Sequence, residues 1–285
     1  MKPALPVNSS VGALRCVLLQ LDATLTNAAR LLFARRVALR HDAALCAMFV
    51  GSRSEASTHW PASESNAALL QQMERGDIDR TSSLFDDALA QGVHPVRWLS
   101  GGADPVGAFC RQALYADLLV LGQHDASIPS SDTAPADFVE SVVMASGKPA
   151  LILPLAGDFG APDRDVLIGW NATPQAARAV TAALPWLRIA RRVHVLEAAG
   201  GAAPQHAGDL DIVHYLHLHG IASTLHRDHA APIDAGEVLL SFASAVGADL
   251  LVMGCYGHHR ARELVLGGAS RTVLGAMTLP VLMVH

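Results

Sequence analysis

The stretch that decides the fold is "VMGCYGHHRARELVLGGASRTVL", residues 252–274. An apolar run ends at Gly254, Gly257 follows in a polar segment, and Gly267 and Gly268 stand directly before a stretch with helical spacing. Backbone N–H groups at a helix start attract phosphate, and glycine lets a phosphate oxygen approach closely. The spacing fits neither a Walker loop nor the dinucleotide fingerprint. On these residues alone, a phosphate site and a structural loop both stay open.

The 285-residue chain contains an internal repeat. Segments of the first half recur in the second half in the same order, which a duplication explains. The similar pairs are 18–24 with 167–173, 91–99 with 219–227, 116–125 with 248–257, and 147–154 with 278–285. Residues 155–165 are rich in Gly, Pro and Asp and read as a linker. We therefore predict two domains, at residues 1–156 and 163–285.

Each half alternates short apolar runs with amphipathic segments of helix length. The runs are 16–21, 44–50, 93–99 and 118–122 in the first half, and 166–170, 193–197, 221–226 and 250–254 in the second, each half closing on a fifth. Such runs argue for parallel strands buried on both faces. We expect an α/β protein of two tandem Rossmann-like open sandwiches, each a parallel five-stranded sheet with helices on both faces. Ligands of such sheets lie beyond the carboxyl ends of the strands, where the strand order switches.

Composition excludes several classes of protein. A hydrophobic content of 51% and a charged content of 16% are typical of a globular chain with a large core, and the net charge of −5 argues against a nucleic-acid partner. No apolar run approaches the ~20 residues of a membrane span, and the first residues lack a signal-peptide pattern. The four cysteines have no C-x-x-C spacing and read as reduced thiols, so we expect a cytoplasmic protein. The histidine-rich segment 214–219 lacks a suitably spaced further ligand, and we predict no metal site.

The glycine motif, following a strand that ends in Met-Gly and preceding a helix and a terminal "PVLMV" strand, resembles the universal stress protein family. "VLIGWNATPQAARAV" (166–180) resembles that family's opening strand and first helix. The resemblance covers both halves, so the chain looks like a tandem member, with the better match in the second half. It implies ATP or another adenine nucleotide as the ligand of the second half, with Mg²⁺ as a candidate companion of ATP.

The resemblance also implies a nucleotide site built from the loops of the second half. The expected site residues are Trp170, Asn171, Ala172, Val195, Met253, Gly254, Gly257, Gly267, Gly268, Ala269 and Ser270. In the family an acidic residue of the first loop lies near the ribose or adenine, and this chain has Asn171 there. Val195 would line the adenine pocket, Met253 would flank the base, and the later glycines would hold ribose and phosphates. The family usually has Ser or Thr after the last glycine, where this chain has Gly268.

The first half departs further from the family pattern. Asp22 keeps the first-loop carboxylate and Gly122 is retained, but Asp125 replaces the second glycine and Asp137 falls near the phosphate-facing position. A carboxylate near phosphate is repulsive. We therefore predict that the first half binds no nucleotide phosphate chain.

The closing strands of the two halves are expected to meet. In the family, terminal strands of two domains pair, so "ALILP" (150–154) and "VLMVH" (281–285) would pair within this chain and cover two sheet edges. The first half would then supply the partner surface of the second. A homodimer is a further candidate assembly.

Three functions stay open on the sequence. The first is a cytoplasmic stress-response sensor or adaptor that binds an adenine nucleotide and hydrolyses ATP weakly at most. The alternative is an interaction protein of the same family that binds no nucleotide and acts through dimerisation or partner docking, a hypothesis motivated by Gly268 and the degenerate first half. The third is an adenylating enzyme, for which the sequence offers no nucleophile and base, and no catalytic residue is predicted.

Overall fold

The computed structural model describes residues 14–22, 24, 26–50, 76, 96–99, 104–128, 134–157, 164–197, 210–227, 235–255 and 268–285. The N-terminal half, up to residue 157, contains the strands β1 (Cys16–Leu21), β2 (Ala44–Phe49), β3 (Val96–Leu99), β4 (Leu118–Gly122) and β5 (Ala150–Leu153). The C-terminal half, from residue 164, contains β6 (Asp165–Trp170), β7 (Arg192–Glu197), β8 (Thr224–Arg227), β9 (Leu250–Gly254) and β10 (Val281–Val284). All of them form one sheet in the order β3-β2-β1-β4-β5-β10-β9-β6-β7-β8.

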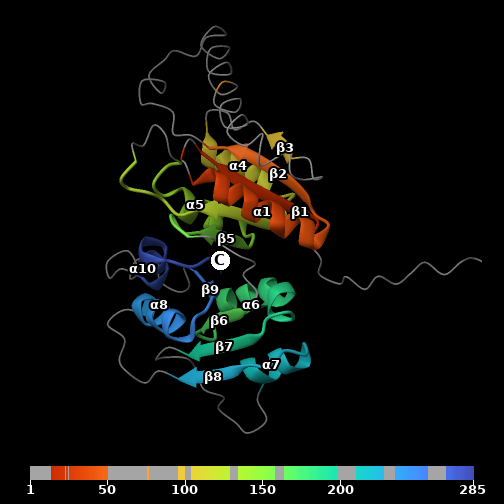
Figure 1. Ribbon diagram of the computed structural model, residues 1–285, viewed down its shortest axis with the longest axis vertical. Coiled ribbons are helices and arrows are strands. Elements are labelled where there is room, and N and C mark those ends of the chain that lie inside the picture. Colours follow the sequence, from red (N-terminus) through yellow and green to blue (C-terminus); the bar gives the residue numbers. More distant parts are fainter. Residues whose placement is uncertain are drawn as a thin grey trace, which may run out of the picture.

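The helices cover both faces of this sheet (Figure 1). One face carries α1 (Asn27–His41), α6 (Pro174–Leu187) and α7 (Ile212–Leu218). The other face carries α4 (Pro105–Ala113), α5 (Phe138–Ser146), α8 (Ala235–Val246) and α10 (Ala269–Ala276). Each of the two hydrophobic clusters between helices and sheet contains residues of both halves, so the core is continuous along the molecule.

The central strands are apolar throughout because both of their faces are covered. In β4, Val120 packs into the cluster under α1, and the next residue, Leu121, packs into the cluster under α4 and α5. Every residue of β4 is buried. Strand pairing is parallel within each half. The predicted fold class, an α/β protein with parallel sheets and helices on both faces, is therefore confirmed.

The two halves meet at an antiparallel junction of β5 and β10, in which Ala150 lies opposite Met283 and Ile152 opposite Val281. The pairing predicted for the closing strands is thus confirmed. In Figure 1 the C-terminus lies between the two halves, because β10 is an inner strand. The two predicted sheets are consequently one sheet, and neither closing strand is an exposed edge.

The sequence pattern placed the third strand of the C-terminal half too early. The run 221–226 predicted a strand, but β8 begins at Thr224, since Ile221 lies after α7 and is buried in the core at 4% exposure. In the N-terminal half β3 begins at Val96, and the earlier part of the run 93–99 lies outside the described residues. Over the described part of the chain, none of the helices combines the length and apolar character needed to cross a membrane.

An ion cluster holds the amino-terminal ends of β6 and β7. The Asp165 side chain, 6% exposed, accepts hydrogen bonds from Arg191 Nη2 at 2.5 Å and from Arg192 Nε at 2.7 Å. The bonds from Arg192 and Arg191 keep the pKa of Asp165 well below its usual range, against the opposing effect of burial. The carboxylate is therefore charged in the folded protein at pH values where an unfolded chain is already protonated.

Replacing this carboxylate is expected to lower stability in a pH-dependent way. A depressed folded-state pKa contributes stability above the unfolded pKa of about 3.9, and this contribution is lost as the pH falls further. The Asp165→Asn variant should therefore melt below the wild type at pH 7, and the difference in Tm should shrink at pH 3. Asp42→Asn is the matched control, because Asp42 makes an exposed ion pair with Arg15 and should melt like the wild type. An equal Tm difference at both pH values would show that the charge of Asp165 is not what matters.

Candidate functional site

The sheet has two places where the strand order switches. In the C-terminal half β6 lies between β9 and β7, and in the N-terminal half β1 lies between β4 and β2. Loops that leave neighbouring strands at such a point part in opposite directions and leave a crevice at the carboxyl ends of the strands. The chain thus has two equivalent crevices, one in each half.

The first loop of the C-terminal crevice is built around the start of α6. Thr173 is the N-cap residue, and its Oγ1 accepts a hydrogen bond from the Ala176 backbone N–H at 3.2 Å while donating to Asn171 Oδ1 at 2.7 Å. Ala172 has a positive φ of 54°, which turns the chain into the helix. Asn171 and Ala172 are exposed, and Trp170 is half-buried against the core. The structure therefore presents Asn171 and Ala172 at the crevice.

Gly254, at the end of β9, lets α6 approach the sheet closely. A Cβ at this position would lie 2.4 Å from the Ala176 backbone nitrogen and 2.6 Å from the Gln175 carbonyl carbon. Met253, the residue before it, is 4% exposed and packs into the cluster on the opposite face. Gly254 therefore lies at the crevice, and the Met253 side chain is directed into the core.

Val195 is not brought to this edge. It is fully buried in the core beside α6 and α7, and it pairs with Ile168 two positions before β7 ends at Glu197. The residue at the strand end, Glu197, instead accepts a hydrogen bond from Arg227 on β8 at 2.9 Å. The sequence "VLE" did not show where the strand ends, so it did not show that Glu197 and not Val195 lies at the carboxyl edge of the sheet.

The third predicted element of the crevice is the start of α10. Gly268 is the N-cap residue, its carbonyl accepts hydrogen bonds from the backbone N–H groups of Arg271 and Thr272, and no side chain of the described residues caps the helix. Gly268 and Ala269 are partly exposed, whereas Ser270 is only 4% exposed. The predicted site residues Gly257 and Gly267 lie outside the described residues.

A buried acceptor at the start of α6 has no partner among the described residues. Gln175, in the first turn of α6, has a buried Oε1 that accepts no hydrogen bond from any residue the structure describes. Its Cβ lies 2.8 Å from the position that a Cβ of Gly254 would occupy, so the side chain starts beside the crevice. An unpaired buried acceptor is costly, and a ligand N–H group would satisfy it.

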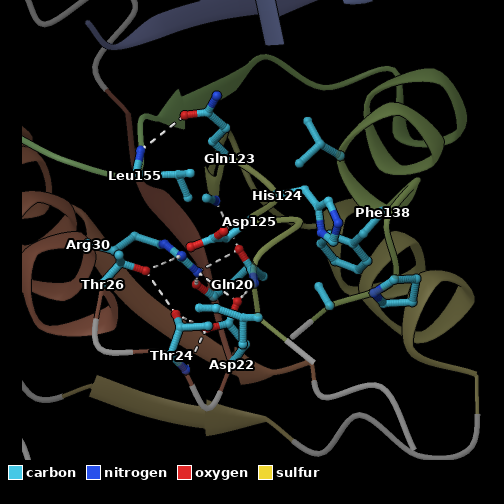
Figure 2. Close-up of a pocket in the computed structure, with 15 residues that line it drawn as sticks. Gln20, Asp22, Thr24, Thr26, Arg30, Gln123, His124, Asp125, Phe138 and Leu155 are labelled. Atoms are coloured by element: carbon cyan, nitrogen blue, oxygen red, sulfur yellow. Dashed lines mark hydrogen bonds and ion pairs between the residues drawn. The ribbon is translucent and has the colours of Figure 1, made fainter. Parts of the chain in front are cut away.

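The N-terminal crevice holds a small hollow that opens to solvent. Figure 2 shows Arg30 and Thr26 on one side of it and His124 and Phe138 on the other. Its wall is part polar and part apolar, and Asp125 lies in the loop after β4 where it accepts two hydrogen bonds from Ser127. These bonds hold the pKa of Asp125 below its usual value, so the loop carries a negative charge.

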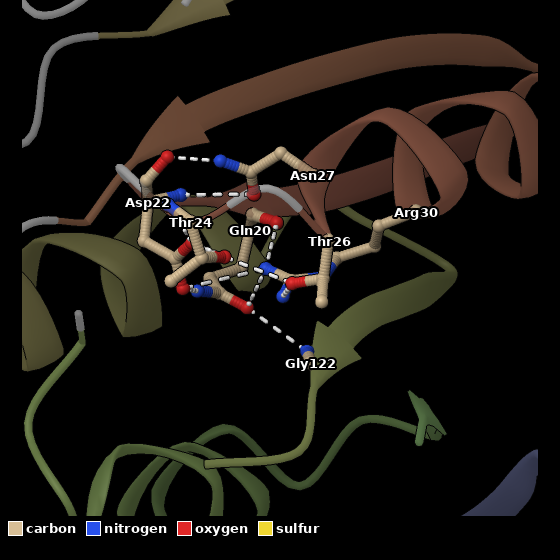
Figure 3. A network of polar contacts seen from close by, with 7 residues as sticks. All are labelled: Gln20, Asp22, Thr24, Thr26, Asn27, Arg30 and Gly122. Carbon is tan, nitrogen blue, oxygen red and sulfur yellow. Dashed lines mark hydrogen bonds and ion pairs between the residues drawn. The ribbon is translucent and has the colours of Figure 1, made fainter. Parts of the chain in front are cut away.

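Asp22, the carboxylate retained from the first loop, is bonded within its own half. Its Oδ1 accepts from the Thr24 backbone N–H at 3.1 Å and from Thr24 Oγ1 at 2.5 Å, and its Oδ2 accepts from Gln20 Nε2 at 3.0 Å (Figure 3). Asn27 donates to the Asp22 backbone carbonyl and closes the loop onto α1. The carboxylate is 5% exposed, so this network already satisfies most of its acceptor capacity.

Arg30 fills the centre of the same crevice. Its Nη1 donates to the backbone carbonyl and to Oε1 of Gln20 at 3.0 and 2.8 Å, its Nη2 donates to Thr26, and Nη1 lies 3.6 Å from Asp22. A Cβ on Gly122 would fall 2.0 Å from the guanidinium, so only glycine fits there. Burial lowers the pKa of Arg30, and the charge of Asp22 opposes that shift.

The two crevices therefore differ in what occupies them. By the repeat, in which 18–24 match 167–173, Gly169 stands where the N-terminal half has Gln20, and the buried Ala179 of α6 stands where it has the buried Arg30. Sequence reasoning did not single out Gln20 or Arg30. The available signals were a glutamine inside the apolar run "CVLLQL" and an arginine on the buried side of α1.

The other candidates of the sequence lie away from both crevices. His214 and His217 are exposed on α7, and His219 stacks on Tyr215 with ring centroids 4.7 Å apart. Among the described residues, no group of three or more His, Cys, Asp or Glu side chains could hold a metal ion.

Comparison with known proteins gives a family for the second half and a fold for the whole chain. The sequence pattern of the universal stress protein family matches residues 164–285. No curated protein matches the chain. A universal stress protein from Archaeoglobus fulgidus DSM 4304 has 16% sequence identity and a TM-score of 0.63, over 94% of this chain and 95% of that chain.

Two structures from Pseudomonas aeruginosa are similar over the same extent. A protein of unknown function from strain PAO1 has 13% identity and a TM-score of 0.57, over 96% of this chain and 93% of that chain. A putative universal stress protein from strain UCBPP-PA14 has 14% identity and a TM-score of 0.54, over 96% and 94%. At such identities the likeness is one of fold, and it includes both halves.

Proposed function

Residues 164–285 belong to the universal stress protein family, and from this premise we propose that the C-terminal half binds an adenine nucleotide at the crevice between β6 and β9. The protein would act in the cytoplasm as a sensor or adaptor in stress response. ATP, ADP and AMP are all candidates, and Mg²⁺ would accompany ATP. Cys16, Cys46 and Cys110 form no disulfide, which supports a reducing compartment.

The residues present fit such a ligand in three respects. The uncapped start of α10 at Gly268 and Ala269 offers backbone N–H groups and the positive end of the helix dipole to a phosphate. The unpaired Oε1 of Gln175 is an acceptor for an N–H donor such as the adenine amino group. Asn171 is exposed at the first loop, where its amide can bond a ribose hydroxyl.

The proposed site gives binding without a chemical step. Asn171, Gly268 and Ala269 offer amide and backbone groups but no nucleophile and no general base. Ser270 is buried, and we do not assign its hydroxyl to the phosphates. We likewise leave out Val195, which is a core residue. We therefore propose a protein that is not an enzyme, with slow ATP hydrolysis at most.

For the N-terminal half we propose that no nucleotide binds. The Gln20, Asp22 and Arg30 side chains occupy its crevice, and the loop after β4 carries the charged Asp125. A phosphate would meet this charge and would have to displace a satisfied buried ion pair.

Calorimetric titration with ATP, ADP and AMP tests the function directly. We expect one nucleotide per chain, because Gln20, Asp22 and Arg30 occupy the N-terminal crevice and the charge of Asp125 would repel a phosphate there. Native mass spectrometry of protein purified from cells would show a retained ligand and the number of chains per particle. If none of the three nucleotides binds at millimolar concentration, the interaction protein without a nucleotide becomes the better hypothesis.

A carboxylate introduced at the start of α10 should lower the affinity for a nucleotide phosphate without lowering the stability of the protein. In Ala269→Asp the new carboxylate favours the helix dipole but repels a phosphate, so we expect nucleotide affinity to fall by about tenfold or more with an unchanged or higher Tm. Adenosine, which has no phosphate, should bind equally to variant and wild type. Ala276→Asp places the same charge at the exposed far end of the helix and is the control. Equal loss of affinity in both variants would argue against a phosphate at this helix end.

A further inference from the structure

One side chain of the N-terminal half reaches the helix of the proposed nucleotide site. Gln123 follows the last residue of β4 and lines the N-terminal hollow. Its Nε2 donates a hydrogen bond of 2.8 Å to the backbone carbonyl of Leu274 in α10, 151 residues away in the sequence. Its Oε1 accepts from the backbone N–H of Leu155, which lines the same hollow, at 3.1 Å. Gln123 thus bridges the N-terminal hollow and the C-terminal half.

The bond to Leu274 is a C-cap supplied from the other half. The last four carbonyls of an α-helix have no partner within the helix, and the Leu274 carbonyl is one of them in α10. The helix has eight residues, which is too short to be stable without tertiary contacts. A cap on Leu274 therefore helps to fix the position of the other end of the helix, about 8–9 Å away along the axis, where Gly268 and Ala269 lie.

The side-chain nitrogen, the side-chain oxygen and the backbone N–H of Gln123 all make hydrogen bonds. Its backbone N–H donates to the Leu153 carbonyl at 2.8 Å, so the residue extends the pairing of β4 with β5. The side chain is half-buried. A change in the shape of the hollow beside Leu155 would therefore act on the amide that caps α10.

We propose that Gln123 is a positioning residue for the nucleotide site of the C-terminal half, and that through it the N-terminal hollow and that site are coupled. This inference rests on the proposed nucleotide binding. It gives the N-terminal half a role that does not require a ligand of its own, because the half supplies the cap that orients the phosphate-facing end of α10.

The Gln123→Glu variant separates the two bonds of this side chain. Glutamate keeps an acceptor for the Leu155 N–H but has no donor for the Leu274 carbonyl, which then faces a carboxylate. We expect the Kd for ADP to rise about three- to tenfold, the loss of one hydrogen bond. Amide exchange in α10 should be faster than in the wild type without nucleotide. Gln112→Glu, the same change at an exposed position of α4, should alter neither quantity.

A reciprocal measurement tests the coupling itself. If the two sites are linked, ADP must slow amide exchange at Leu155 in the wild type, and this effect must vanish in Gln123→Glu. A role of Gln123 in stability alone would not give that ligand-dependent change. Gln123→Met, which removes both bonds without adding charge, is the second variant in case the glutamate unfolds the protein.

The outcomes are distinct. An unchanged Kd and unchanged exchange of α10 in both variants, with ADP still binding to the wild type, would overturn the positioning role and leave the proposed function standing. A wild type that binds no ADP would overturn the proposed function and the positioning role together. Weaker ADP binding in the variants, with loss of the ligand effect at Leu155, would support both.

Discussion

Gly254→Val should lose about 3 kcal/mol of folding free energy and bind adenine nucleotides at least tenfold more weakly than the wild type. The added Cβ would stand 2.4 Å from the Ala176 backbone nitrogen and 2.6 Å from the Gln175 carbonyl carbon. Both atoms belong to the main chain of the first turn of α6, so no side-chain rotation can relieve the overlap. The helix start has to move away from β9.

This movement should affect the site as well as stability. The first turn of α6 is joined to the first loop through Thr173, whose hydroxyl bonds both the helix and Asn171. A displaced helix start therefore displaces the loop that faces the ligand. The two effects can be measured by urea unfolding and by nucleotide titration.

Gly275→Ala is the matched control for a glycine substitution. Gly275 lies in α10 with no atom within 4 Å of the added Cβ, and alanine is the better helix former. This variant should gain about 0.5–1 kcal/mol and keep its nucleotide affinity. A Gly254→Val protein with wild-type stability would contradict the close packing of α6 on β9.

Arg30→Met is expected to destabilise the protein by about 3–5 kcal/mol, the usual cost of leaving one member of a buried ion pair alone. Asp22 would remain nearly buried with its charge uncompensated, and Gln20 would lose the donor to its side-chain oxygen. Urea unfolding should show the loss as a lower midpoint.

Two further variants identify the cause. Arg178→Met makes the same substitution at an exposed position of α6, so it should have little effect on the free energy of unfolding. Combining Arg30→Met with Asp22→Asn removes both charges, and the double variant should be more stable than Arg30→Met alone. If the double variant is no better, packing and not charge would account for the loss.

The strands that place the site were predictable from the sequence because they are central and buried on both faces. The runs 118–122 and 250–254 have the bounds of β4 and β9, and the match of 150–154 with 281–285 indicated the junction of β5 and β10. The edge strand β8 was placed too early. One face of an edge strand is less completely covered, so its apolar pattern is weaker.

The polar filling of the N-terminal crevice could not be predicted because it joins residues far apart in the chain. Gln20 accepts from the backbone N–H of Gly122 at 2.9 Å, across 102 positions of sequence. Local patterns show that Arg30 lies on a helix, but not that its guanidinium lies over the end of β4. The sequence shows that Asp22 keeps the first-loop carboxylate, but only the three-dimensional contacts show that it is bonded to Gln20 and Thr24.

The junction of β5 and β10 also determines how the assembly depends on concentration. Two separate domains that met at these strands would dissociate on dilution, whereas two halves of one chain meet at a high effective concentration at every protein level. Each half stays paired with the other half through β5 and β10 even when the residues of its own crevice change. The covalent link therefore allows the N-terminal half to fill its crevice with Arg30 and Gln20 and still complete the sheet on which the other half depends.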